Sequence, residues 1–186
     1  MIFLKNYLNE YKRNLNLKET EIKKLIKIKN TLLNIKKKNK KILVFGNGGS
    51  AAISSHFAVD LTKNAKIRAV NFNEADLITC FSNDYGYENW IKKSIEYYHD
   101  KGDVIILISS SGKSKNIINA AKYAKKNKIT LISFTGINKN NPLRKISNIS
   151  IFIDSKSYNI VECIHQILIL SIVDLIIGKS EYSSNL

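Results

Sequence analysis

Apolar residues follow two different spacings, which alternate along most of the chain. Short apolar-rich runs, typical of strands covered on both faces, occur at 41–45, 67–72, 104–108, 129–134 and 149–153. Apolar residues with helical spacing lie near 50–62, 88–99, 114–127 and 158–177. This alternation predicts an α/β fold, a three-layer αβα sandwich whose central parallel sheet is covered by helices on both faces.

The N-terminal part of the chain has a helical pattern without strands. Residues 2–39 predict two helical segments, each with an apolar stripe. The stripe residues are Phe3, Leu4, Tyr7, Leu8 and Tyr11 in the first segment and Ile22, Leu25, Ile26, Leu32 and Leu33 in the second. We therefore divide the chain into an N-terminal helical segment at 1–40, a domain at 41–178 and a short tail at 179–186.

Two stretches predict loops instead of regular elements. The sequence Ser-Asn-Asp-Tyr-Gly-Tyr at 82–87 predicts a loop that follows the apolar segment 77–81. The single proline, Pro142, follows a predicted turn at 138–141 and precedes a short predicted helix.

The net charge of +15 raises the question of a nucleic-acid partner. Only three of the 30 basic residues are arginines, whereas recognition of bases and phosphates favours arginine, so we expect no specific nucleic-acid binding. Residues 1–41 hold 13 Lys and Arg and three Glu, a net charge of +10. We interpret this excess as a solvated helix face, and the alternative is a landing patch for an acidic partner.

The apolar run near 160–177 approaches the length of a membrane span. Glu162, His165, Gln166 and Asp174 interrupt it, so we expect a buried helix and no membrane partner. The N-terminus lacks the apolar stretch of a signal peptide, which favours a cytoplasmic location.

The two cysteines match no metal or redox spacing. Cys80 and Cys163 both lie in apolar runs, and we expect buried free thiols in a reducing cytoplasm.

Two turns rich in glycine and serine are the candidate ligand-binding segments of the sequence. Ser109-Ser110-Ser111-Gly112-Lys113-Ser114 follows one predicted strand, and Gly46-Asn47-Gly48-Gly49-Ser50 follows another; each precedes a helix. Free backbone N–H groups, the positive end of a helix dipole and serine hydroxyls make such turns anion sites, most often for phosphate. The turn at 46–50 has neither a dinucleotide fingerprint nor the Lys-Ser or Lys-Thr pair of a Walker loop, and we expect no nucleotide cofactor. Because ligands bind beyond the carboxyl ends of parallel strands, the two turns predict one pocket for a small phosphorylated metabolite.

The motifs, taken in order, resemble the SIS (sugar isomerase) fold and, within it, the phosphoheptose isomerases. They are Gly46–Ala52 followed by His56-Phe57-Ala58 and Leu61, then Asn83-Asp84-Tyr85-Gly86, then Gly102-Asp103-Val104, and finally Ile108-Ser109 with Ser111-Gly112 and Ser114. The resemblance implies a cytoplasmic homotetramer, with segment 1–40 used for oligomerisation. It implies an aldose–ketose isomerase that converts sedoheptulose 7-phosphate to D-glycero-D-manno-heptose 7-phosphate through an enediol, for lipopolysaccharide or capsule heptose synthesis.

The resemblance also implies roles for individual residues. The phosphate would be held by Ser109, Ser110, Ser111 and Ser114. The sugar would be lined by Asn47, Gly48, Gly49, Ser50, Asn83 and Asp84. Zinc is implied as a cofactor, and its ligands here would be His56, Asp60 and Glu162, which leave a fourth position open.

The catalytic positions depart from the family pattern. Asp60 stands where the family has a glutamate base, and Leu170 stands where the family has its second catalytic histidine. One hypothesis is that Asp60 and Glu162 form an acid–base pair whose mutual repulsion raises one pKa. A second hypothesis is that His165 swings into the site. A third is a non-catalytic phosphosugar-binding or adaptor protein, like the SIS relatives that bind the replication initiator.

Overall fold

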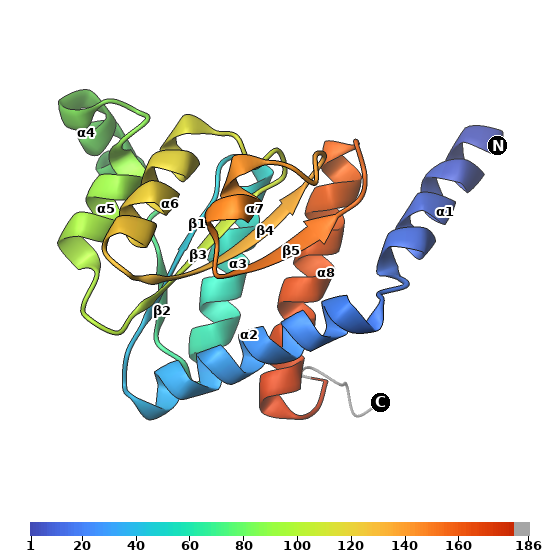
Figure 1. The fold of residues 1–186 in the computed structure, drawn as a ribbon, viewed down its shortest axis with the longest axis horizontal. Helices are drawn as coiled ribbons and strands as arrows, with labels where there is room; N and C mark the ends of the chain where they lie inside the picture. Colours follow the sequence, from blue (N-terminus) through green and yellow to red (C-terminus); the bar gives the residue numbers. More distant parts are fainter. Residues whose placement is uncertain (181–186) are drawn as a thin grey trace.

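A five-stranded parallel sheet forms the centre of the molecule (Figure 1). The computed structural model describes residues 1–180. The strands are β1 Ile42–Phe45, β2 Ala69–Asn71, β3 Val104–Ser109, β4 Thr130–Gly136 and β5 Ile149–Ile153. Their order is β2-β1-β3-β4-β5, and every neighbouring pair is parallel. The predicted three-layer α/β sandwich is therefore confirmed.

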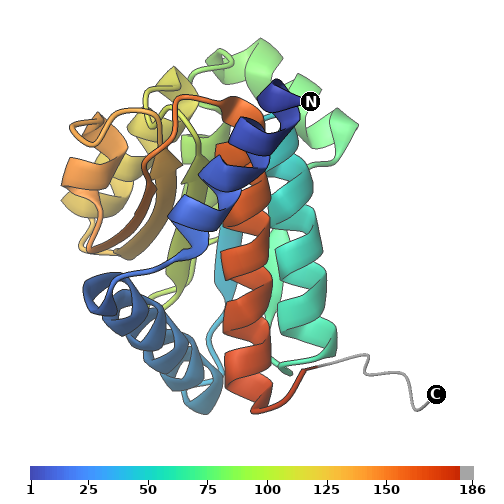
Figure 2. The same cartoon turned by 90° about the vertical axis from the view of Figure 1, so that its right-hand side faces the viewer.

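Helices cover both faces of the sheet. One face carries α2 Glu19–Lys37, α3 Gly49–Lys63 and α8 Tyr158–Ile177, with α1 Ile2–Leu15 packed on α8. The other face carries α5 Trp90–Tyr98, α6 Lys115–Lys126 and α7 Pro142–Ile146, and α4 Ala75–Tyr85 contacts α5 at its edge. Figure 2 shows α3 and α8 side by side, with α1 running across the upper part of α8 and α2 at the lower left.

Alternate residues of each strand point to opposite cores. Ile42 and Val44 of β1 join the core under α2, α3 and α8, whereas Leu43 and Phe45 join the core under α5 and α6. This period of two explains why β1 and residues 104–108 of β3 are apolar at every position.

The prediction of a loop at 82–87 is wrong for its first four residues. Residues 82–85 form the last turn of α4, and the helix ends at Gly86, whose φ of 81° suits glycine. None of the α4 residues is buried, so Asn83 and Asp84 are accommodated on an exposed helix. The loop residues that remain are 86–89.

The prediction of buried thiols is also wrong. Cys80 lies on the exposed α4, and Cys163 lies on the outer side of α8, so both free thiols are exposed. On α8 the sheet-facing positions are taken by neighbouring residues such as Ile164 and His165. Apolar sequence neighbours do not bury a residue that a helix turns outward.

By length and composition, α8 is the one helix within residues 1–180 that could cross a membrane. In the fold it packs against α2, α3 and the sheet, and 44% of its most apolar window is buried. The interpretation of α8 as a core helix of an α/β domain is consistent with these contacts.

The N-terminal helices differ in what they bury. Leu25, Ile28, Leu32 and Ile35 of α2 are buried against the sheet and α8. No residue of α1 is buried, and Phe3, Leu4 and Leu8 are exposed although Tyr7 and Tyr11 pack against the core.

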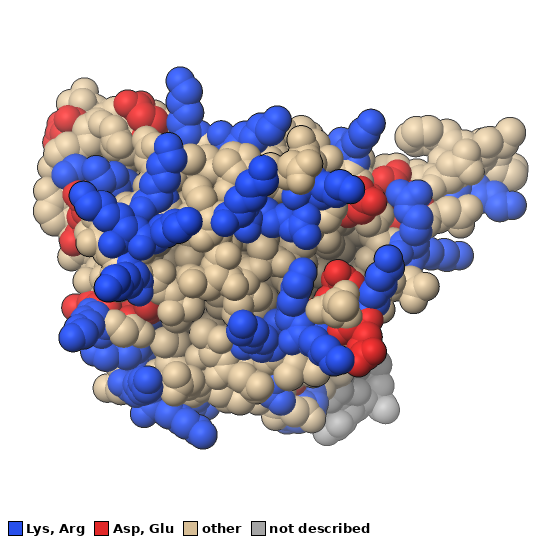
Figure 3. Space-filling model, viewed as in Figure 1, with Lys and Arg blue, Asp and Glu red and all other residues tan. Residues whose placement is uncertain are grey.

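Lysine and arginine are spread over the whole of the face seen in Figure 3 and are not gathered in one stripe.

The core of β3 gives a first test of the fold. Ile106 is fully buried, whereas Ile26 on α2 is 45% exposed. We expect Ile106→Ala to lower the free energy of unfolding by about 2–5 kcal/mol, because it leaves a cavity under α2 and α3. The matched Ile26→Ala variant should change it by less than about 0.5 kcal/mol. Urea titrations followed by circular dichroism measure both, and equal losses would contradict the fold.

Candidate functional site

Two turns and the first part of α8 enclose a small cavity at the carboxyl edge of the sheet. Its volume is about 120 Å³. The lining residues come from the turn after β1, the turn after β3 and α8: Asn47, Ser50, Ile108, Ser109, Ser110, Ser111, Ser114, Tyr158 and Glu162. The structure thus brings together the four serines predicted for phosphate with Asn47, Ser50 and Glu162, because β1 and β3 are neighbours.

A pair of side-chain amides fastens the two turns to each other. Asn47 Nδ2 donates to Asn116 Oδ1 at 3.0 Å, and Asn116 Nδ2 donates to Asn47 Oδ1 at 2.9 Å. The hydroxyl of Tyr87 donates to the same Asn47 oxygen at 3.2 Å. Asn116 is buried at the start of α6 and was not predicted from the sequence. Asn116 is buried and Asn47 half-buried, and amides that satisfy each other away from water hold one arrangement of the turns.

The turn after β3 is anchored by backbone bonds on both sides of its apex. The Gly136 N–H donates to the Ser110 carbonyl at 2.8 Å, and the Leu143 N–H donates to the Gly112 carbonyl at 3.2 Å. Gly112 has a φ of 60°, and a Cβ there would lie 2.2 Å from Asn141 Oδ1. Glycine is therefore required at the apex both for the backbone conformation and for space.

The cavity offers hydrogen-bond donors that have no partner within the described chain. The Ser110 hydroxyl is buried without a hydrogen bond, and the Ser114 hydroxyl makes no capping bond although Ser114 is the N-cap of α6. The N-terminus of α6 adds the positive end of its dipole. Such a set of donors fits an anionic group with several oxygens, and phosphate has that chemistry.

Glu162 places a carboxyl group in the same cavity. A Cβ built on Gly49 would lie 2.3 Å from Glu162 Oε2, so the carboxyl group packs directly on the first turn of α3. Burial raises the pKa of Glu162 above its ordinary value. Glu162 can therefore hold a proton, or accept one from a hydroxyl group, at higher pH than an exposed glutamate.

A second polar cluster lies further along the contact between α3 and α8. His56 Nε2 is 3.4 Å from Asp60 Oδ2, and His56 Nδ1 is 2.9 Å from Gln166 Nε2. Asp60 is buried, while the His56 side chain is 51% exposed. The sequence placed His56 and Asp60 on one helix face but did not identify Gln166. The signal was its position one turn after Glu162 on the same helix.

The structure does not bring Asp60 and Glu162 together within one chain. Glu162 contacts Gly49, and Asp60 follows eleven residues later, about 16 Å along the helix axis. Desolvation is the cause of the raised pKa of Glu162, with no contribution from Asp60. The hypothesis of two mutually repelling carboxylates is therefore wrong for the single chain, since it required the two groups to share one site.

The proposed metal ligands are not gathered either. Within residues 1–180 no group of three His, Cys, Asp or Glu side chains is placed to hold a metal ion. His56 and Asp60 are adjacent, but Glu162 lies in the serine cavity. The residues present therefore do not fit the predicted three-ligand zinc site within one chain.

Three other predicted residues lie outside the cavity. Asn83 and Asp84 are exposed on α4, where Asn83 Nδ2 donates to Asp84 Oδ1 at 3.0 Å. His165 does not swing into the site, because it is fully buried and its Nε2 is bonded to the Thr135 carbonyl at 3.2 Å.

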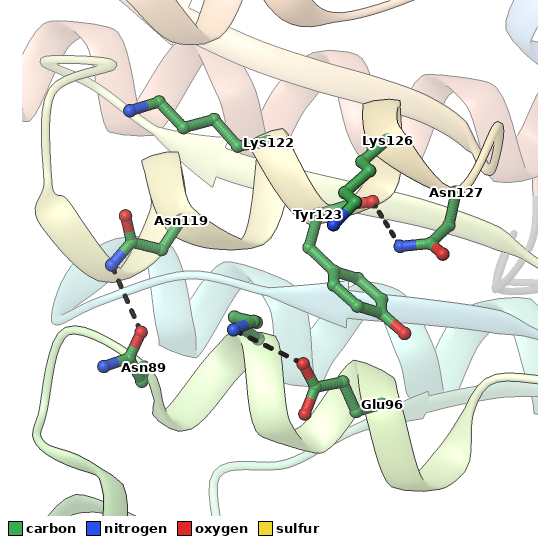
Figure 4. A pocket seen from close by; sticks show the side chains of 8 residues that line it. Asn89, Glu96, Asn119, Lys122, Tyr123, Lys126 and Asn127 are labelled. Atoms are coloured by element: carbon green, nitrogen blue, oxygen red, sulfur yellow. Dashed lines mark hydrogen bonds and ion pairs between the residues drawn. The ribbon is translucent and has the colours of Figure 1, made fainter.

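A larger cavity lies between α5 and α6, on the other side of the sheet (Figure 4). Its volume is about 440 Å³, and lysine and asparagine side chains dominate its lining: Asn89, Lys92, Glu96, Asn119, Lys122, Tyr123, Lys126 and Asn127. Its one carboxylate, Glu96, is paired with Lys92 at 3.5 Å and Lys93 at 2.7 Å. The smaller cavity is the better candidate because it joins unpartnered donors to an unpaired carboxyl group.

Comparisons with known proteins agree with this geometry. The family model described as SIS domain matches residues 6–136. A phosphoheptose isomerase from Fusobacterium nucleatum is 31% identical over 180 residues, 91% of this chain and 92% of the relative. A probable phosphoheptose isomerase from Thermoplasma acidophilum is 34% identical over 183 residues, 94% of this chain and 98% of the relative. The solved structure of phosphoheptose isomerase GmhA from Neisseria gonorrhoeae has a TM-score of 0.85 at 26% identity, covering 93% of this chain and 97% of that chain.

The apex glycine gives a test of the cavity. Gly112→Ala and Gly178→Ala both place a side chain at positive φ, but only the first meets an occupied space. Asn141 cannot give way easily because its side chain is bonded to Asn138 and Arg144. We expect Gly178→Ala to cost about 1–2 kcal/mol of stability with unchanged binding of inorganic phosphate. Gly112→Ala should cost about 1–3 kcal/mol more and weaken phosphate binding measured by titration calorimetry. Equal behaviour of the two variants would place the anion elsewhere.

Proposed function

This chain belongs to the phosphoheptose isomerase family of SIS-domain phosphosugar isomerases, and we propose that it interconverts sedoheptulose 7-phosphate and D-glycero-D-manno-heptose 7-phosphate. The observation that supports this substrate class most is the serine cavity at the N-terminus of α6, where the Ser110 hydroxyl is buried without a partner and the Ser114 hydroxyl makes no capping bond. We further propose a cytoplasmic enzyme whose product serves surface heptose synthesis.

The phosphate and the reacting carbons occupy different parts of the site in this proposal. A phosphate on C7 of an extended sugar is remote from C1 and C2. The contact between α3 and α8 runs from Gly49 and Glu162 to His56 and Gln166. Seven residues of α3, about 10 Å of helix, separate Gly49 from His56. With the phosphate in the serine cavity, the reacting end therefore points toward His56 and Asp60.

The chemistry is a proton transfer between C1 and C2. In the ketose-to-aldose direction Asp60 takes a proton from C1 while O2 gains one, which gives the enediol. O1 then loses its proton, and Asp60 returns the carbon-bound proton to C2. His56, beside Asp60 at 3.4 Å, is the group placed to give the proton to O2 and take one from O1. Glu162 accepts hydrogen bonds from hydroxyl groups of the intervening chain.

Two substitutions separate these roles. We expect Asp60→Asn to lower kcat about 10²–10⁴-fold while phosphate binding stays intact, because it removes the base and leaves the serine cavity unchanged. Glu162→Gln should change KM more than kcat, because it alters hydroxyl binding. Asp154→Asn, which removes an exposed carboxylate after β5, is the matched control and should leave both constants unchanged.

Coupled assays of heptose 7-phosphate formation measure these constants. Wild-type protein that binds the sugar phosphate but forms no product would favour the non-catalytic adaptor hypothesis. An active Asp60→Asn variant would remove Asp60 from the mechanism.

We propose that a second copy of this chain covers α1 and that the assembly is a homotetramer. The support is the apolar stripe of α1, where Phe3 is 79% and Leu4 58% exposed in the single chain. Isolated helices with such a stripe are stabilised by a partner surface.

We expect Leu4→Asp combined with Leu8→Asp to dissociate the assembly, because the substitution places charges in an apolar contact. The control combination Lys5→Asp with Lys12→Asp changes exposed polar positions on the same helix. Sedimentation velocity measures the oligomeric state. A wild-type monomer, or an unchanged assembly in the Leu4 and Leu8 variant, would contradict the proposal.

A further inference from the structure

His165 is fully buried and contacts a backbone carbonyl group. It lies on the sheet-facing side of α8, three residues after Glu162, and packs edge-on against Phe134 with ring centroids 5.8 Å apart. Its Nε2 is 3.2 Å from the Thr135 carbonyl oxygen, and its Nδ1 is buried without a hydrogen-bond partner. A carbonyl only accepts hydrogen bonds, so Nε2 carries the proton and Nδ1 does not.

The carbonyl that His165 contacts belongs to a peptide group with a second partner. The N–H of that same peptide group, on Gly136, donates to the Ser110 carbonyl at 2.8 Å. The Thr135–Gly136 peptide is therefore held by the imidazole on one side and by the serine turn on the other. A peptide that accepts a hydrogen bond at its oxygen becomes a stronger donor at its nitrogen.

The geometry points to His165 as a positioning residue that sets the conformation of the phosphate-binding turn through the Thr135–Gly136 peptide. Ser110 contributes its buried, unpartnered hydroxyl to the cavity, so any shift of its carbonyl moves that donor. The inference rests on the proposed function, in which this turn binds the phosphate of the substrate. His165 itself touches no ligand in this account.

Close packing leaves the end of β4 little freedom to find another arrangement. A Cβ built on Gly136 would lie 2.6 Å from Val161 Cγ1 and 3.2 Å from the Ile153 carbonyl oxygen. The peptide is thus pressed between α8 and β5, and the Thr135 carbonyl has no access to water, since Thr135 is fully buried. Burial lowers the pKa of His165 to about 4, so the imidazole stays neutral at pH 7.

The hydrogen bond can be separated from packing by substitution. A glutamine amide can reach the position of Nε2 and donate to the Thr135 carbonyl, whereas leucine fills the volume without a donor. We expect His165→Leu to raise KM for the sugar phosphate, and the inhibition constant of inorganic phosphate, about tenfold, with kcat changed far less. His165→Gln should restore both constants nearly to wild-type values.

Phe134→Leu is the control for packing next to the imidazole. It should lower the melting temperature and leave KM unchanged, because it removes the ring contact and no hydrogen bond. If His165→Leu keeps the wild-type KM, or if Phe134→Leu raises KM as much, His165 acts only through packing and the inference is overturned. If His165→Gln raises KM as much as His165→Leu does, the donated hydrogen bond does not determine phosphate binding, and the inference is overturned.

Should the leucine variant fail to fold, His165→Asn takes its place. The asparagine amide is one methylene shorter and falls at the position of Nδ1, so it should raise KM where glutamine does not. Nitrogen-15 NMR of histidine-labelled wild-type protein gives an independent readout: we expect a protonated Nε2 and a bare Nδ1 at pH 7. A protonated Nδ1 overturns the inference. Wild-type protein that neither binds phosphate nor isomerises the sugar would instead remove the proposed function.

Discussion

The adjacency of β1 and β3 in a parallel sheet is the constraint on which the site depends. The register pairs Phe45, the last residue of β1, with Leu107 of β3. β3 continues to Ser109, and the turns that follow the two strands lie at the same edge of the sheet. The reciprocal amide bonds of Asn47 and Asn116 then fix the distance between the turns. Without this pairing, the glycine-rich and serine-rich turns would be two separate anion sites on helix N-termini, each too shallow for a metabolite.

The site has two levels because α3 and α8 run side by side. Near the sheet edge, Gly49 contacts Glu162 and the buried Ser110 hydroxyl lacks a hydrogen-bond partner. About two turns further along, His56 joins Asp60 and Gln166 in a polar cluster. A substrate with its phosphate at one end and its reacting carbons at the other suits this separation. Different side chains therefore bind the phosphate and transfer the protons. Leu170 lies one helical turn after Gln166 on α8.

Much of this fold could be predicted from sequence patterns, because the spacing of apolar residues and the positions of glycine reflect local secondary structure. The apolar runs locate the strands, and 158–177 coincides with α8 because its apolar content and capping glycine define a long core helix. The two turns can be predicted because a run of glycine and serine between a buried strand and a helix is typical of an anion-binding turn. The exposure of Cys80 and the helical state of 82–85 were missed, since both depend on α4 having no layer above it. The separation of Asp60 from Glu162, and the roles of Gln166 and Asn116, depend on the alignment of one helix with another. Spacing along a single helix does not encode that alignment.

The central claim is that the phosphate binds in the serine cavity and the sugar extends along α3 and α8 toward Asp60. A crystal structure with an unreactive, reduced analogue of the heptulose phosphate tests it most directly. We expect the phosphate oxygens within hydrogen-bond distance of the Ser110, Ser111 and Ser114 donors, and C1 and C2 beside the Asp60 carboxylate. An analogue whose phosphate lies outside this cavity, for example among the lysines between α5 and α6, would contradict the account.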